Sequence, residues 1–275
     1  MALNKPSVKI EFVPDSPNIA YKIAGQGDPV IFLHGIGGNK DNWVRQIEFF
    51  SRSNTVIAWD ARGYGDSEDY LGPLDFRAFS HDIRRLLDHL DIKKAHLCGL
   101  SMGGRIILDF YELHKERVSS LTLVDTFPGF DNSFTEEGRE RFIQERRQPL
   151  VEGGKEPADI APSVVPGIVS PSASKAVVNE LIQSMSKLHK DSYVKTIESM
   201  TMYKPVADVS QILVPVQIIV GEEDKLTPPS VSQNMHEKIA DSRLEIISNA
   251  GHITNIEAPE RFNNCLRNFL EEVSL

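Results

Sequence analysis

The spacing of apolar residues along the chain predicts strands that alternate with helices. Near the N-terminus, two short segments alternate apolar and polar residues, which is typical of an antiparallel strand pair; they are residues 8–13 and 19–23. After Pro29, short continuous apolar runs precede segments of helical periodicity. These runs cover residues 30–33, 55–59, 95–98, 121–124, 216–220 and 244–247. Such runs indicate a parallel sheet covered on both faces, so we predict an α/β fold with a mostly parallel, eight-stranded sheet.

The same periodicity predicts helices between these strands. They cover residues 41–51, 76–90, 102–115, 229–239 and 259–273, and Pro259 suits the first turn of the last one. The alternation stops between residues 127 and 204, where helical patterns at 136–147, 175–188 and 192–202 are joined by Pro- and Gly-rich links such as 152–154 and 161–163. We therefore predict a helical cap, residues 127–204, inserted into an α/β-core of residues 1–126 and 205–275. It should lie at the carboxyl edge of the sheet, where ligands bind in open α/β folds.

Composition narrows the class of protein. The chain has 275 residues, of which 40% are hydrophobic and 25% charged, as in ordinary soluble globular proteins. Its formal net charge of -9 argues against a nucleic-acid partner. No segment approaches the ~20 apolar residues of a membrane span, and residues 1–6 lack the apolar core of a secretory signal. We expect a cytoplasmic protein with no membrane association; the oligomeric state cannot be inferred.

The segment Gly99-Leu100-Ser101-Met102-Gly103 has the pattern G-x-S-x-G and lies between a predicted strand and a predicted helix. A serine at such a sharp turn projects its hydroxyl outward. Glycines on either side, Gly99 and Gly103, let the chain bend where a Cβ would clash. An ordinary Gly-rich connection is the alternative. The setting predicts Ser101 as a nucleophile.

A serine nucleophile needs a base, and the base needs an orienting acid. His252 follows the last apolar run in a short loop, so it reaches the same sheet edge as Ser101 and is the predicted base. Two aspartates qualify as the acid because each follows a strand at that edge. We favour Asp224, since Pro228 and Pro229 define a turn after it, and keep Asp125 as the alternative acid.

Other polar groups near these positions receive simpler interpretations. Glu222 and Glu223 are expected to be solvated carboxylates of the Asp224 loop, and Asp125, if it is not the acid, is expected to shape the first hinge of the cap or bind a backbone amide. His189 falls in the cap, where contact with a substrate is possible.

The predicted intermediate also needs backbone donors for its oxyanion. One is the N–H of Met102, directly after the nucleophile. The other is expected from the Gly-rich loop of residues 34–39, with the N–H of Ile36 as the candidate. His34 is expected to brace this loop next to Gly35 and not to act as the base.

These motifs together resemble the α/β-hydrolases of the serine type. The likeness rests on five segments, which read HGIGG at 34–38, DARGYGDS at 60–67, GLSMGG at 99–104, GEED at 221–224 and AGH at 250–252. Within that superfamily, residues 99–104 and 251–257 are most similar to 3-oxoadipate enol-lactonases. A serine at position 101 argues against the dehalogenase and epoxide hydrolase branches, which use an aspartate nucleophile.

The resemblance implies an α/β-hydrolase fold and a serine hydrolase that cleaves a small carboxylic ester or enol-lactone through an acyl-enzyme. No metal and no organic cofactor is expected; the partner is the small-molecule substrate. One alternative is a C–C bond hydrolase of vinylogous diketones, although Ile36 and Ile253 differ from the residues usual there. Cofactor-free perhydrolase-like esterases and ligand receptors of the same fold are further alternatives.

The substrate itself cannot be inferred from the sequence. A carboxylate clamp for an acidic substrate could be drawn from five arginines, although a solvated helix face explains the last four more simply; they are Arg105, Arg139, Arg141, Arg146 and Arg147.

Overall fold

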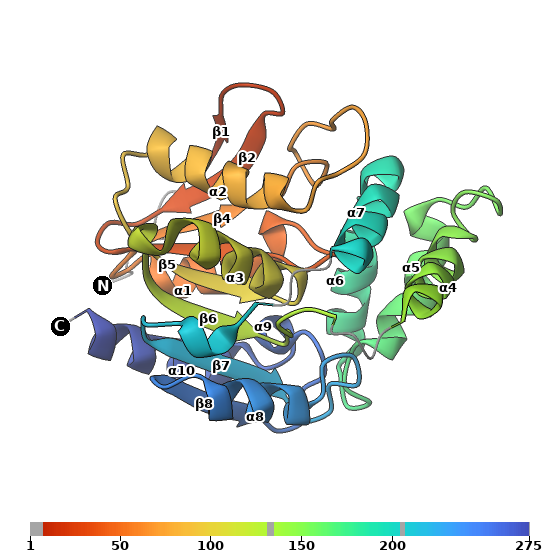
Figure 1. Cartoon of the computed structure of the whole chain (residues 1–275). Helices are drawn as coiled ribbons and strands as arrows, with labels where there is room; N and C mark the ends of the chain where they lie inside the picture. Colours follow the sequence, from red (N-terminus) through yellow and green to blue (C-terminus); the bar gives the residue numbers. More distant parts are fainter. Residues whose placement is uncertain (1–7, 131–134, 204–206, 275) are drawn as a thin grey trace.

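In the computed structural model, which describes residues 8–130, 135–203 and 207–274, eight strands form one sheet (Figure 1). The strand order is β1-β2-β4-β3-β5-β6-β7-β8. Strand β2 pairs antiparallel with β1 and β4, and every other neighbouring pair is parallel. The predicted mostly parallel eight-stranded sheet is confirmed. The strands are β1 (Lys9–Val13), β2 (Ile19–Ala24), β3 (Pro29–Leu33), β4 (Thr55–Trp59), β5 (Ala95–Leu100), β6 (Val118–Val124), β7 (Val216–Gly221) and β8 (Ser242–Ile247).

Helices cover both faces of the sheet, as predicted. Helices α2 and α3 pack side by side on one face, and α1 and α10 pack together on the other (Figure 1). The core helices are α1 (Val44–Phe50), α2 (Arg77–His89), α3 (Met102–His114), α8 (Pro229–Lys238), α9 (Thr254–Glu257) and α10 (Pro259–Val273). The predicted helix 41–51 is divided, because a 3₁₀ turn at Lys40–Trp43, capped by the Asn39 side chain, precedes α1.

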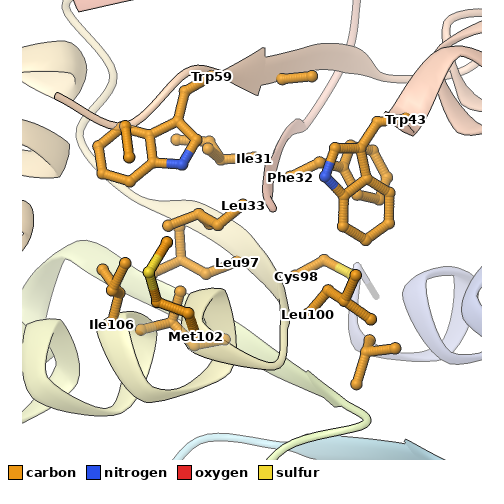
Figure 2. Packing of buried hydrophobic residues seen from close by; sticks show 14 of the residues in the cluster. Ile31, Phe32, Leu33, Trp43, Trp59, Leu97, Cys98, Leu100, Met102 and Ile106 are labelled. Carbon is orange, nitrogen blue, oxygen red and sulfur yellow. The ribbon is translucent and has the colours of Figure 1, made fainter. Parts of the chain in front are cut away.

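The central strands carry buried apolar side chains on both faces, which explains their continuous apolar sequences. Figure 2 shows Leu33 pointing toward Met102 and Ile106, whereas its neighbour Phe32 points to the opposite side, toward Trp43. All five side chains are almost completely shielded from solvent. This two-sided core holds the carboxyl ends of β3, β5, β6 and β7 in fixed relative positions.

In the described part of the chain between β6 and β7, four α-helices lie at the carboxyl edge of the sheet (Figure 1). They are α4 (Glu136–Arg147), α5 (Pro157–Val164), α6 (Lys175–Met185) and α7 (Lys190–Met202). We call this unit the cap. It is tied to the core by polar contacts: Arg45 forms two 2.7 Å hydrogen bonds with Glu180, and the Ser192 hydroxyl donates to Asp69.

The cap also corrects one sequence-based expectation. The link predicted at residues 161–163 lies inside α5, with Pro162 within the helix. Pro157 opens the helix, and the Glu156 amide donates to the Asp159 side chain at its first turn. Ile160 and Ala161 are buried. Burial of this apolar side outweighs the one helical hydrogen bond that a proline removes.

The predicted helix 175–188 ends earlier, at Met185. No helix in the described part of the chain is both long and apolar enough to cross a membrane.

Candidate active site

Ser101 lies at a strained turn between β5 and α3. Its backbone has φ 53° and ψ -112°, a conformation that L-residues rarely adopt. Neighbouring segments leave no room for larger residues at the flanking glycines: a Cβ on Gly99 would lie 2.3 Å from the Gly103 oxygen, and one on Gly103 would lie 2.4 Å from the Leu33 oxygen. The Ser101 amide donates to the Val124 carbonyl at 2.8 Å, which fixes the turn against β6. The hydroxyl is thereby held at the carboxyl edge of the sheet.

The structure brings Ser101, His252 and Asp224 together. His252 Nε2 lies 2.9 Å from Ser101 Oγ, and His252 Nδ1 lies 2.7 Å from Asp224 Oδ2. Because an ionised carboxylate only accepts, Nδ1 carries the proton and Nε2 is free to accept from the serine hydroxyl. The three side chains therefore form a relay with the hydrogen-bond polarity that serine activation requires.

Asp224 is held by residues that follow it in the same turn. Its Oδ1 accepts from the amides of Leu226 and Thr227 at 2.8 and 3.0 Å, and its Oδ2 accepts from Thr227 Oγ1 at 2.7 Å. Thr227 is not among the residues predicted from the sequence, although a threonine three residues after the aspartate in a Pro-terminated turn is the available signal. Each carboxylate oxygen of Asp224 therefore accepts two hydrogen bonds, counting the one from His252, and these bonds fix the orientation of the carboxylate.

Burial and charge have opposite effects on the two titrating groups. Burial lowers the pKa of His252, but the hydrogen bond and charge of Asp224, with smaller contributions from Asp125 and Glu257, raise it above 6.5. Burial raises the pKa of Asp224, yet hydrogen bonds from His252 and Thr227 outweigh it, and the net pKa is lowered. The pair thus favours a charged aspartate beside an imidazole that readily takes up a proton.

Asp125, the alternative acid, has other partners. It directly follows β6 with a φ of 44°, accepts from the Gly221 amide at 2.9 Å, and accepts from the amide and hydroxyl of Thr254 at 3.0 and 2.7 Å. Burial raises its pKa to about 7. It therefore ties the end of β7 to α9, whereas the His252 ring faces Asp224.

Glu223 contradicts the expectation of a solvated carboxylate, because its Oε2 accepts from Ser170 Oγ at 2.6 Å. That serine belongs to the cap, which the sequence pattern alone could not place beside residue 223. Glu222 is exposed as expected.

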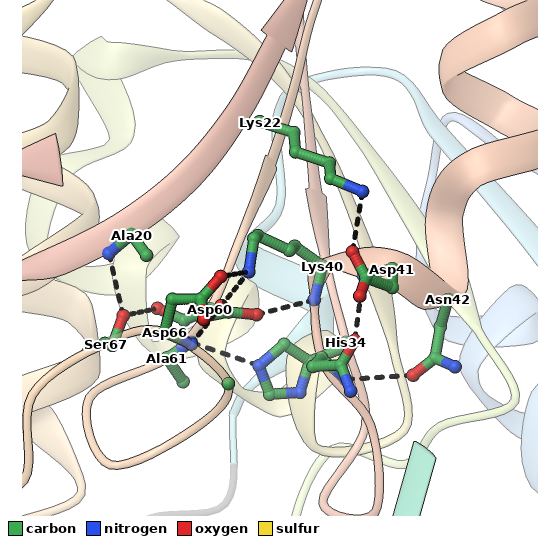
Figure 3. A network of polar contacts seen from close by, with 12 residues as sticks. Ala20, Lys22, His34, Lys40, Asp41, Asn42, Asp60, Ala61, Asp66 and Ser67 are labelled. Carbon is green, nitrogen blue, oxygen red and sulfur yellow. Dashed lines mark hydrogen bonds and ion pairs between the residues drawn. The ribbon is translucent and has the colours of Figure 1, made fainter. Parts of the chain in front are cut away.

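The loop after β3 is braced by His34. Its Nδ1–H donates to the Gly35 carbonyl at 2.8 Å, and its Nε2 accepts from the Ala61 amide at 3.0 Å (Figure 3). Burial lowers the pKa of His34, which keeps the ring neutral for these bonds. Lys40 Nζ, beside it, pairs with Asp60 at 2.6 Å and with Asp66 at 2.5 Å (Figure 3). The ring thus holds the loop to the β4 turn and does not reach Ser101.

A cavity of about 490 Å³ opens above the serine. Its floor comes from the core and includes Ile36, Ser101 and His252, and its walls come largely from apolar side chains of the cap, such as Phe142, Leu181 and Ile197. Met102 is the first residue of α3, where helical amides lack an intrahelical partner. Ile36 thus lines the cavity, Met102 directly follows Ser101 in the chain, and their amides stay the predicted oxyanion donors.

The arginines proposed as a carboxylate clamp are dispersed. Of the five, Arg146 alone lines the cavity. Arg105 is buried and donates to the Met200 carbonyl at 2.9 Å, and Arg139, expected on a solvated face, is buried and donates to the Thr201 carbonyl. Carbonyls in the last turn of a helix lack intrahelical donors, which explains why two cations gather at the end of α7. His189 contacts Asp69 and the Gly65 carbonyl and is not one of the residues that line the cavity.

Comparison with known proteins gives a consistent family assignment. A family model described as the alpha/beta hydrolase fold matches residues 28–259. The curated 3-oxoadipate enol-lactonase 2 of Acinetobacter baylyi is 30% identical over 252 residues, covering 90% of each chain. A 2-hydroxy-6-oxononadienedioate/2-hydroxy-6-oxononatrienedioate hydrolase of Escherichia coli is 29% identical over 276 residues, covering 96% of this chain and 94% of its own.

Solved structures agree with the fold. A thermophilic esterase from Thermogutta terrifontis superposes with a TM-score of 0.85 at 27% identity, covering 97% of this chain and 99% of that one. The enol-lactonase from Burkholderia xenovorans LB400 gives a TM-score of 0.84 at 23% identity, covering 95% of this chain and 100% of that one. The second likeness, at this identity, concerns the fold alone.

Proposed function

Because the chain belongs to the α/β hydrolase fold family, we propose that it is a serine hydrolase that cleaves a small carboxylic ester or enol-lactone through an acyl-enzyme. The observation that carries this proposal is the hydrogen-bonded series Ser101 Oγ, His252 Nε2, His252 Nδ1 and Asp224 Oδ2, with distances of 2.9 and 2.7 Å. These are the distances expected of a nucleophile, its base and an orienting acid.

In the first half-reaction, His252 Nε2 takes the proton of Ser101 Oγ as the oxygen attacks the carbonyl carbon. Asp224 stabilises the imidazolium that forms and keeps Nδ1–H directed at itself. The tetrahedral oxyanion accepts from the amides of Met102 and Ile36. Its collapse breaks the carbon–oxygen bond, and the proton on His252 passes to the leaving oxygen.

In the second half-reaction, His252 removes a proton from water, which attacks the acyl carbon. The second tetrahedral intermediate uses the same two amides. Collapse releases the carboxylic acid and returns the proton to Ser101 through His252. For a lactone, the two halves open one ring and give a single hydroxy acid, or its keto form where the lactone is an enol ester.

The cavity supports a small substrate with a substantial apolar part. Its volume of about 490 Å³ lies in the range of small-molecule sites, and aromatic and aliphatic side chains dominate the walls. The A. baylyi relative is named as an enol-lactonase and the T. terrifontis relative as an esterase. Both names support an acyl–oxygen bond as the target.

A C–C bond hydrolase is the second candidate, since the E. coli relative is named as a hydrolase of 2-hydroxy-6-oxo dienedioates. Such a reaction breaks a carbon–carbon bond and must protonate a carbon leaving group. At positions 36 and 253 the cavity is lined by isoleucines, whose apolar side chains cannot donate a proton for that step. An acyl–oxygen bond, whose leaving oxygen can take the proton from His252, is therefore favoured.

The decisive experiment compares wild type with Ser101→Ala on a panel of p-nitrophenyl esters, enol-lactones and ring-fission diketones. We expect wild type to turn over an ester or lactone, and Ser101→Ala to lose about 10⁶-fold in kcat, as removal of a serine nucleophile does in comparable enzymes. Ser230→Ala, an exposed serine of α8, is the matched control and should behave as wild type.

A fluorophosphonate probe supplies a second readout, because it labels only an activated serine. Turnover of diketones alone would favour the C–C hydrolase. Absence of both turnover and labelling in wild type, with tight ligand binding, would favour a receptor.

A further inference from the structure

One segment of the cap contacts both loops that carry the proposed acid and base. The Ser170 amide donates to Glu257 Oε2 at 2.8 Å, and the Ser170 hydroxyl donates to Glu223 Oε2 at 2.6 Å. Two residues earlier, the Ile168 carbonyl accepts from the His252 amide at 2.8 Å. The cap is therefore bonded to the backbone of the base itself and to the residue next to Asp224.

Glu257 stands at the centre of these contacts. Its Oε2 accepts from the Ser170 amide of the cap, and its Oε1 accepts from the amides of Gly251 and Ile253 at 3.1 and 3.2 Å. These are the residues on either side of His252. Glu257 belongs to α9, which begins at Thr254 directly after this loop. One half-buried carboxylate thus bonds the chain before the base, the chain after it and the cap.

The three amides of residues 251–253 are consequently all held. Two donate to Glu257, and the middle one donates to Ile168. A histidine side chain can move only by rotation about its own bonds or by movement of this backbone. Because the His252 ring must stay within hydrogen-bond reach of Ser101, small displacements of the loop are costly for catalysis.

We propose that Glu257 is a positioning residue for the base: it fixes the backbone around His252 and joins it to the cap segment 168–170. The proposal rests on the proposed function, because it assigns a role relative to the Ser101–His252 step. Glu257 touches neither the substrate cavity nor Ser101, so it acts through His252. The cap's own bond to the base is a separate one, from the His252 amide to the Ile168 carbonyl, and both Glu257 variants leave it in place.

The charge of Glu257 gives an independent signature. The groups that act on the His252 pKa are Asp224 on the β7–α8 loop, Asp125 at the end of β6 and Glu257 on α9, and all three raise it. Glu223 is the other carboxylate at Ser170. Burial raises the pKa of Glu257, and the three amides that donate to it oppose this effect. Removing only its charge should therefore lower the pKa of His252.

Two conservative substitutions separate geometry from charge. In Glu257→Gln, the side-chain oxygen can still accept from Gly251 and Ile253, and the new NH₂ group meets the Ser170 amide. We expect kcat close to wild type, a lower melting temperature, and an acid limb of kcat/KM that moves to lower pH. Glu257→Asp keeps the charge, but its shorter side chain cannot span the loop and the cap. We expect its kcat to fall by about 10²-fold with KM retained and the acid limb in place.

Exposed Glu260, in the first turn of α10, provides matched controls. Glu260→Gln and Glu260→Asp should keep the wild-type kcat and pH profile. The inference is overturned if Glu257→Asp keeps wild-type kcat, or if Glu257→Gln loses as much kcat as Glu257→Asp. If the role of Glu257 were structural alone, both Glu257 variants would have lower melting temperatures. The loss of kcat would then not be confined to Glu257→Asp, nor the shift of the acid limb of kcat/KM to Glu257→Gln.

NMR titration of ¹³C-labelled His252 distinguishes this failure from failure of the proposed function. Its imidazole pKa should fall in Glu257→Gln whether or not an ester is turned over. An unchanged titration contradicts the role of Glu257. A wild-type protein that turns over no ester or lactone, but shows the shift, contradicts the proposed reaction and leaves the contact of Glu257 with the His252 loop supported.

Discussion

Replacing Asp224 by asparagine tests the hydrogen-bond polarity of the site more sharply than removing the side chain. Asp224 Oδ1 accepts from two backbone amides, those of Leu226 and Thr227. An asparagine must keep its oxygen there, because an NH₂ group would meet two donors. The NH₂ group therefore takes the position of Oδ2, which faces Thr227 Oγ1 and His252 Nδ1. The hydroxyl can rotate and accept, but the imidazole has to change its tautomer.

The consequence for catalysis follows from that tautomer. An NH₂ donor 2.7 Å from Nδ1 requires Nδ1 to be the acceptor, so the proton moves to Nε2. Nε2 then cannot take the proton of Ser101. In serine enzymes the corresponding change lowers kcat by about 10⁴-fold, which corresponds to about 5.5 kcal/mol in transition-state free energy at 1.36 kcal/mol per factor of ten. We expect a loss of this size with little change in KM.

The assay is steady-state hydrolysis of p-nitrophenyl butyrate, with thermal unfolding as the check on folding. Asp125→Asn is the matched control, since Asp125 is also a buried aspartate but bonds Gly221 and Thr254. It should lower the melting temperature and cost far less kcat. A folded Asp224→Asn variant with wild-type kcat would refute the argument. A larger loss in Asp125→Asn than in Asp224→Asn would identify Asp125 as the acid.

Two further predictions follow from the site. The His252 imidazole must be neutral to act as the base, and its pKa is raised above 6.5. In a pH–rate profile, kcat/KM should therefore fall as the pH falls, with a midpoint above 6.5. A midpoint below 6.5 would contradict the interaction of His252 with Asp224. Gly103→Ala places a Cβ 2.4 Å from the Leu33 oxygen and should lower the unfolding free energy by about 1–3 kcal/mol. Gly167→Ala, where no atom lies within 4 Å of the added Cβ, is the control in denaturant titration, and equal stabilities would contradict the prediction.

The sequence predicted the core well because its signals are local. A continuous apolar run such as residues 216–220 indicates a strand buried on both faces without knowledge of its neighbours. The strained turn at Ser101 is likewise encoded by glycines within two residues of it. Since parallel strands end at one edge, the loops of Ser101, Asp224 and His252 could be placed together before any contact was known.

Contacts between the cap and the core could not be predicted in this way. The sequence alone predicts a solvated Glu223, because its partner Ser170 is distant in sequence. It likewise predicts a solvated Arg139, because its partner Thr201 at the end of α7 is 62 residues away. Pro162 indicated a break, yet burial of one helix side outweighed its missing hydrogen bond. In each instance tertiary packing reversed a local preference.

The contacts of Ser170 limit which parts of the cap can be exchanged without affecting the proposed base. Side chains that line the cavity walls, such as Phe142, Leu181 and Ile197, come from α4, α6 and α7 and can change without touching Ser101. The segment 168–170 lies in the same insertion, and Ile168 also lines the cavity, but the Ile168 carbonyl and the Ser170 amide and hydroxyl bond the loops of Asp224 and His252 and α9. Exchange of the cap walls should therefore alter the substrate, whereas exchange of the whole cap also removes a support of the base. We therefore expect substrate specificity and the proposed catalysis to be separable only where that segment is preserved.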